Sequence, residues 1–185
     1  DDQHYVVENP YLRDIGNLPS FFMSPRYSSF DKNFTAHYRP LVVSSFAVNY
    51  AVGGLNPIGY HLVNLFFHTG SAFGVFLVVR GMALPLFSAL SAGLIFALHP
   101  FNSEAVNYIT ARSSVMCTFF YLLAFWSWIQ YRDAGNRHRS SFYVAALLSF
   151  LLAILSKEIA ITLPLVLWVY DRYFLKGDVT GLFDW

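Results

Sequence analysis

The chain has 185 residues, of which 56% are hydrophobic and only 12% are charged, and its formal net charge is +1. Soluble domains carry about 25% charged residues, so this composition excludes an ordinary water-soluble domain. The near-neutral balance gives no reason to expect nucleic-acid binding. We therefore predict an all-α integral membrane protein.

The first 57 residues are predicted to form one extramembrane loop, because turn-forming residues and the prolines at positions 10, 19, 25 and 40 divide it into short pieces. Residues 38–51 within it are apolar and have the character of a helix. That segment is shorter than the roughly 20 residues that a membrane crossing needs. We therefore expect it to lie in the membrane interface.

Apolar runs follow this loop and predict a bundle of about five transmembrane helices over residues 58–176, with a short tail at 177–185. The runs cover residues 58–79, 83–98, 113–129, 141–155 and 159–170. Residues 103–131 are expected to form one long helix that begins outside the membrane. Several runs are short for a full crossing, so tilted or partly buried helices are expected.

The charged residues between the runs predict how the chain is oriented. Basic residues occupy alternate gaps, at Arg80, Arg132, Arg137, Arg139, Arg172 and Lys176. Cytoplasmic loops are enriched in Lys and Arg, so we assign these gaps and the tail to the cytoplasm. The loop 1–57, the 99–112 loop and the Lys157–Glu158 pair then face the lumen or periplasm. The chain is thus expected to be a multi-pass membrane protein.

The first run carries polar side chains on one helical face, because His61, Asn64 and His68 are spaced by three and four residues. Two interpretations are open for this face. The side chains either form hydrogen bonds with neighbouring helices, or they line a polar cavity inside the bundle.

Acidic residues on the predicted outer side are candidates for chemistry. Asp1 and Asp2 are adjacent carboxylates, and such pairs favour different protonation states, so that one can act as a base while the other holds a cation. A solvated acidic terminus is the simpler alternative. Glu104 follows Asn102 and Ser103, so its carboxylate also suits a helix N-terminus.

Basic residues lie near these acids. In a continuous helix Glu104, Tyr108 and Arg112 share one face, which descends about 12 Å toward the membrane. Arg112 at that depth needs a paired or bound anion. The Lys157–Glu158 neighbours are either an interfacial ion pair or part of the same site.

Four segments that follow Asp1-Asp2 carry a family resemblance, in the order VENPYLR, HYRPLVVSSFAVNYAVGGLNPIGYHLVNLFFH, ALHPFNSEAVNYITARSSVM and LSKEIAITLPLVLWVYDRYF. They resemble the N-terminal membrane region of the transmembrane and tetratricopeptide-repeat O-mannosyltransferases and their bacterial relatives, over nearly the whole chain. The blocks YRP, GYHLVN, HP-x-x-x-EAV and SKE-x-A are short, but their shared order is specific. The wider class is the GT-C glycosyltransferases.

The resemblance implies transfer of a sugar, mannose in the family, from a polyprenyl- or dolichyl-phosphate donor to Ser or Thr hydroxyls of a protein acceptor. It implies that Asp1 or Asp2 is the catalytic base and that Glu104 orients the acceptor or a divalent metal. No metal ligand set follows from the sequence itself. The substrate-binding set that the resemblance implies consists of Arg39, His99, Arg112, Lys157 and Glu158.

The chain departs from the GT-C pattern in its small number of expected helices, in the missing helix before the acidic pair and in the absence of a tetratricopeptide repeat. We therefore expect an enzyme fragment or a compact relative. The alternative is a non-catalytic subunit that packs against other membrane subunits. A transporter element is a weaker alternative, because no internal repeat supports it. The expected partners are membrane lipid, the polyprenyl-phosphate sugar donor, the protein acceptor and other membrane subunits.

Overall fold

The computed structural model describes residues 3–24, 38–133 and 138–174, and every regular element in these ranges is a helix. Helices satisfy their backbone hydrogen bonds internally, which a chain in lipid requires. Together with the apolar helices described below, this confirms the predicted all-α membrane fold class. The predictions for Asp1 and Asp2 and for the tail 177–185 concern residues outside the described ranges.

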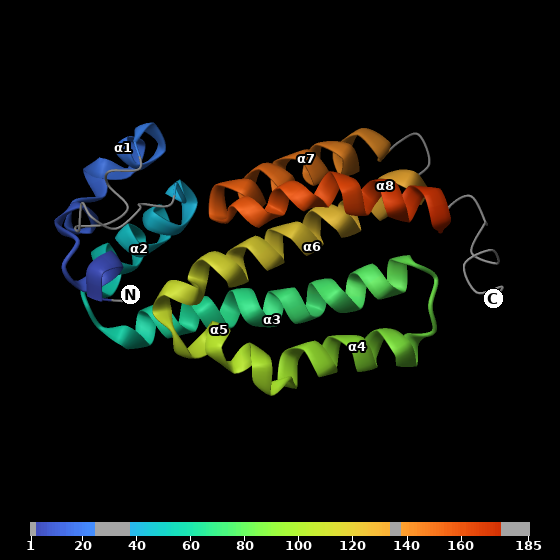
Figure 1. Cartoon of the computed structure of the whole chain (residues 1–185), viewed down its shortest axis with the longest axis horizontal. Coiled ribbons are helices and arrows are strands. Elements are labelled where there is room, and N and C mark those ends of the chain that lie inside the picture. The colour runs from blue at the N-terminus through green and yellow to red at the C-terminus, as the bar shows by residue number, and fades with distance from the viewer. Residues whose placement is uncertain (1–2, 25–37, 134–137, 175–185) are drawn as a thin grey trace.

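Short helices form the N-terminal part and pack at one end of the bundle (Figure 1). They are η1 (Gln3–Val7), η2 (Pro10–Arg13), η3 (Ile15–Asn17), α1 (Leu18–Met23) and α2 (Pro40–Gly53). Side chains cap the N-termini of η2 and η3. Asn9 Oδ1 accepts from Tyr11 N at 3.1 Å, and Asp14 Oδ1 accepts from Gly16 N at 2.8 Å. A buried apolar cluster that includes Phe21 joins these helices to the bundle.

Three helices are long and apolar enough to cross a membrane: α3 (Pro57–Gly81), the segment Ile109–Asp133 and α7 (Arg139–Ser156). The middle segment consists of η6 (Ile109–Ala111) and α6 (Arg112–Asp133). A fourth span counts if α4 (Leu86–Leu98) is combined with η5 (Pro100–Asn102) and α5 (Ser103–Asn107), which bend by 50° at the break.

Two predictions about individual elements are wrong. The segment 103–131 is not one helix, because Tyr108 adopts an extended backbone, with φ −95° and ψ 128°, between α5 and η6. The run 159–170 is divided into η7 (Glu158–Thr162) and α8 (Leu163–Tyr173), which has 11 residues. At 1.5 Å per residue α8 spans about half of the roughly 30 Å hydrocarbon core.

The centre of the bundle is α6, which packs between α3 and α7 (Figure 1). Glycines let α3 approach it closely. A Cβ added at Gly70 would lie 2.7 Å from the Phe119 ring, and one at Gly81 would lie 2.9 Å from Ile129. Helices α3, α6 and α8 begin at the end where α4 and α7 finish, so residues far apart in sequence meet there.

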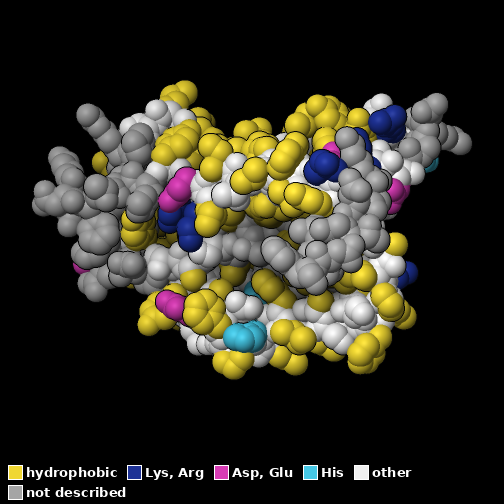
Figure 2. All heavy atoms as spheres, turned by 45° about the vertical axis from the view of Figure 1, so that its right-hand side comes forward, with side chains coloured by type: hydrophobic (Ala, Val, Ile, Leu, Met, Phe, Trp, Pro, Cys, Tyr) yellow, Lys and Arg dark blue, Asp and Glu magenta, His cyan; other side chains and the backbone are white. Residues whose placement is uncertain are grey.

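Hydrophobic side chains cover much of the flank of the bundle, whereas charged side chains gather toward its two ends (Figure 2). Large apolar residues are exposed on α3, α4 and α7, among them Phe66 at 64%, Phe87 at 80% and Leu148 at 56%. Such a flank suits lipid and not water. The ends are therefore where polar chemistry can take place.

Candidate active site

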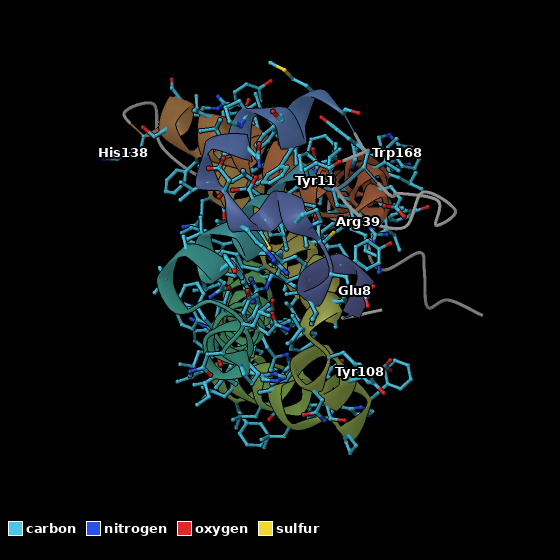
Figure 3. All side chains as sticks on the ribbon, turned by 90° about the vertical axis from the view of Figure 1, so that its left-hand side faces the viewer. Glu8, Tyr11, Arg39, Tyr108, His138 and Trp168 are labelled. Carbon is cyan, nitrogen blue, oxygen red and sulfur yellow. The ribbon has the colours of Figure 1, made fainter. Side chains whose placement is uncertain are left out.

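A cleft of about 790 Å³ lies at the end of the bundle that carries α1 and α2. Its walls come from η1, α2, α5, η6 and the first turn of α6. The polar side chains that line it include Arg39, Glu104, Tyr108, Ser113 and Ser114. Figure 3 looks onto this end and shows Arg39 between the α7–α8 side and the α5 segment that leads to Tyr108.

Arg39 is placed in the cleft because it precedes Pro40 at the N-terminus of α2. Its guanidinium donates to both carboxylate oxygens of Glu158, from Nη2 to Oε1 at 3.0 Å and from Nε to Oε2 at 3.4 Å. Nη1 also donates to Ser113 Oγ at 3.4 Å. The Arg39 side chain is 21% exposed and the Glu158 side chain 66%, so solvent screens this ion pair from the Glu158 side. Another anion can therefore exchange with Glu158.

Lys157 reaches the same wall from the end of α7. Its Nζ donates to Ser114 Oγ at 2.9 Å, and Ser114 lines the cleft. Two consecutive serine hydroxyls at the start of α6 are therefore each held by a cation. Two cations with hydroxyls between them form a local arrangement that attracts an oxyanion.

Glu104 lines the cleft from the first turn of α5. It is exposed, and its carboxylate forms no ion pair or hydrogen bond with any other described residue. A carboxylate that is not engaged elsewhere can accept a hydrogen bond from a hydroxyl in the cleft. Within the described ranges, no three His, Cys, Asp or Glu side chains are grouped as metal ligands.

Arg112 does not line the cleft, because its side chain is completely buried behind the wall. It donates to Asn64 Oδ1 at 2.9 Å, to Asn49 Oδ1 at 2.6 Å and to the Tyr60 carbonyl at 2.8 Å. Its guanidinium also lies 4.6 Å from the centre of the Phe46 ring. Neutral acceptors and ring faces therefore stabilise this charge.

Several named proteins are similar to this chain. The O-mannosyl-transferase Tmtc1 of Drosophila melanogaster is 39% identical over 176 residues, which is 92% of this chain and 20% of that protein. Human TMTC3 is 32% identical over 181 residues, 96% of this chain and 20% of the relative. Mouse TMTC4 is 33% identical over 194 residues, 92% of this chain and 26% of the relative. No family model matches the sequence, and no solved structure matches it.

Over the length that it spans, the chain belongs to the TMTC family. This confirms the resemblance on which the site residues were chosen. The chain covers about a fifth of the length of Tmtc1 and TMTC3, which are each named as protein O-mannosyl-transferases.

In this TMTC-family chain the predicted substrate-binding residues occupy different surroundings. Arg39 lines the cleft, with Glu158 bound to it, and Lys157 contacts the cleft wall through Ser114. His99 is exposed and does not line the cleft; its Nδ1 accepts from Phe101 N at 3.2 Å. Arg112 is buried, as described above.

The predicted catalytic residues are only partly described. Glu104 lies in the cleft, whereas Asp1 and Asp2 are outside the described residues, so their role stays a prediction. The geometric argument that Glu104, Tyr108 and Arg112 share one helical face is wrong. The helix breaks at Tyr108, which leaves Glu104 exposed and Arg112 buried.

Sequence reasoning missed Ser113 and Ser114, because they open an apolar run and were assigned to the membrane segment. Their position directly after Arg112 was the available signal. The polar face of α3 forms hydrogen bonds with a neighbouring segment, as the first of its two interpretations predicted. His61, Asn64 and His68 each form a hydrogen bond with a backbone carbonyl of the segment 97–109, at 3.1, 3.0 and 3.1 Å.

Proposed function

We propose that this chain forms part of the active site of a membrane transferase, which moves mannose from a polyprenyl-phosphate donor to a Ser or Thr hydroxyl of a protein. The observation that carries the proposal is one cleft that brings together Arg39, the Lys157-bound Ser114 and the Glu104 carboxylate, which pairs with no described residue. The relatives Tmtc1 and TMTC3 are named protein O-mannosyl-transferases, which supports the reaction class.

The cations suit the leaving group of this reaction. The acceptor oxygen forms a bond with the anomeric carbon of the sugar, while the bond from that carbon to the phosphate oxygen breaks. The carrier phosphate leaves with the bonding electrons, and its negative charge grows in the transition state. Arg39 and Lys157, with Ser113 and Ser114 between them, are the groups that would stabilise this charge.

The acidic residues suit the binding and deprotonation of the acceptor hydroxyl. Its hydroxyl proton must pass to a base within hydrogen-bond reach. Asp1 or Asp2 would take this proton, and Glu104 would hold the hydroxyl through a hydrogen bond to its carboxylate. If a divalent metal takes part, Glu104 is the described carboxylate best placed to contact it, because it alone among the described acids lines the cleft.

We further propose that the cleft faces the lumen or periplasm, together with residues 1–57 and the 99–112 loop, and that the bundle 58–176 crosses the membrane. The basic residues Arg80, Arg132, Arg139 and Arg172 support this orientation. They lie at the helix ends remote from the cleft, which the positive-inside rule assigns to the cytoplasm (Figure 1).

Replacing Glu104 by Gln in the full-length protein tests the proposal. The change removes the charge and keeps the size, and the loss of a group that positions a reactant can cost about 100-fold in rate. We expect mannose transfer from a polyprenyl-phosphate mannose donor to fall by that factor. Asp133→Asn is the matched control, because Asp133 is an exposed carboxylate at the last residue of α6, remote from the cleft. Unchanged transfer by Glu104→Gln would favour the non-catalytic subunit.

A further inference from the structure

The segment between α4 and α6 contains helix ends. Side chains of α3 form hydrogen bonds with the backbone carbonyls there. His61 Nδ1 lies 3.1 Å from the carbonyl oxygen of Val106, so this nitrogen carries the hydrogen. Asn64 Nδ2 donates to the Tyr108 carbonyl at 3.0 Å and to the Ile109 carbonyl at 3.4 Å. A helix end inside a protein needs such partners for its free carbonyls. The break at Tyr108 is therefore held from one side by α3.

Arg112 fixes the direction of the Asn64 amide. Its Nε donates to Asn64 Oδ1 at 2.9 Å, which leaves only the Asn64 NH₂ group to face the carbonyls. Rotating the amide by half a turn would aim two donors at each other and two acceptors at each other. The buried charge of Arg112 makes that arrangement costly. One buried cation thereby determines how α3 holds the break.

We propose that Asn64, oriented by Arg112, and His61 are positioning residues for Glu104. This rests on the proposed function, in which Glu104 holds the acceptor. Glu104 stands on α5, a helix of only five residues, and the carbonyls bound by His61 and Asn64 lie at its end and just beyond it. The position of so short a helix depends on these contacts. Misplacing a catalytic group by about 1 Å can cost roughly 100-fold in rate.

Two matched variants distinguish the positioning of Glu104 by Asn64 from the effect of a new carboxylate next to the buried Arg112. Asn64→Asp keeps an acceptor for Arg112 but loses the NH₂ group that binds the Tyr108 and Ile109 carbonyls. Asn49→Asp gives Arg112 the same new carboxylate through its Nη1 contact, which is 2.6 Å long, and leaves the Asn64 contacts unchanged. We expect transfer by Asn64→Asp to fall between about 10- and 100-fold and transfer by Asn49→Asp to stay near the wild-type rate. Equal losses in both variants would overturn the proposal.

Combining each variant with Glu104→Gln distinguishes this proposal from the proposed function. If Asn64 acts through Glu104, Asn64→Asp should lower transfer little further once Glu104 is Gln, because residues that act as a unit are not additive. The same fold-loss in both backgrounds would show that Asn64 acts elsewhere. If Glu104→Gln alone leaves transfer unchanged, it is the proposed function that fails.

Two further measurements do not depend on the folding of Asn64→Asp. His61→Asn places an amide nitrogen where Nδ1 stood, so we expect it to retain transfer that His61→Ala loses. Glu104→Cys, on a background without other accessible cysteines, reports the local geometry by its rate of maleimide labelling. That rate should change several-fold when His61→Ala is added and stay unchanged with Asn49→Asp. Equal rates in all three proteins would contradict the positioning role.

Discussion

The roles of two arginines depend on their surroundings. Arg39 precedes Pro40, and Arg112 precedes Ser113. Arg112 is fully buried among neutral acceptors, whereas Arg39 lies in the cleft and shares its guanidinium with Glu158 and Ser113. The family resemblance implied that both residues bind the substrate. Burial separates them, and burial depends on packing between segments that local sequence does not reveal.

The Arg39–Glu158 pair leads to a prediction about donor affinity. Glu158→Gln removes a carboxylate that competes with the donor phosphate for Arg39. An exposed pair contributes at most about 1 kcal/mol, so we expect the KM for the polyprenyl-phosphate donor to fall by up to about five-fold. Steady-state kinetics of the full-length protein would measure this change.

Asp171→Asn is the control for Glu158→Gln. Asp171 pairs with Arg132 at 3.6 Å on helices α8 and α6, away from the cleft, and an asparagine there can still accept from Trp128 Nε1. This variant should leave the donor KM unchanged. A rise in KM for Glu158→Gln would show that Glu158 contacts the donor itself.

The sequence predicted helices correctly where a long apolar run can cross the membrane. It did not predict where contacts with a neighbouring helix interrupt one. The runs that became α3 and α7 follow from composition, because a membrane span needs a continuous apolar stretch. The break at Tyr108 has no proline or glycine beside it, so the local sequence favours a continuous helix. It is stabilised by His61 and Asn64, more than forty residues away.

Close packing of α3 against α6 gives a prediction about stability. Gly70→Ala would place a methyl group 2.7 Å from the Phe119 ring. Overpacking of this kind costs typically 1–3 kcal/mol, so we expect a lower thermal midpoint of unfolding in detergent. Gly53→Ala is the control, because a Cβ at Gly53 meets nothing within 4 Å. A midpoint equal to that of the control would show that α3 and α6 separate easily.

At the scale of the whole molecule, the residues of the proposed site come together because four separate segments begin or end at the same side of the bundle. Arg39, Glu104, Ser114 and Lys157 come from α2, α5, α6 and the end of α7. The alternation of apolar runs and charged gaps predicted that such residues share a side. It did not predict which of them touch, because that depends on the bend between α4 and α5 and on how α2 packs.

This arrangement predicts that the two ends of the bundle face different compartments. Phe101 lines the cleft and is 85% exposed. His138 precedes α7, which begins at the other end of the bundle (Figure 1). In sealed microsomes, a membrane-impermeant maleimide added from outside should label His138→Cys and leave Phe101→Cys unlabelled until the membrane is opened. Labelling of both from one side would contradict the proposed orientation.

The Arg39–Glu158 pair also has a consequence for biogenesis. It joins residues 119 positions apart, and Lys157 meets Ser114 across 43 positions. A ribosome that is still translating α6 or α7 has produced Arg39 but not its partner. The early segments can enter the membrane one after another, but the cation cluster assembles only after residue 158 has emerged and folded back. The proposed donor site is therefore incomplete in a nascent chain, and under the proposed function a lipid-linked sugar would bind only after the bundle has closed.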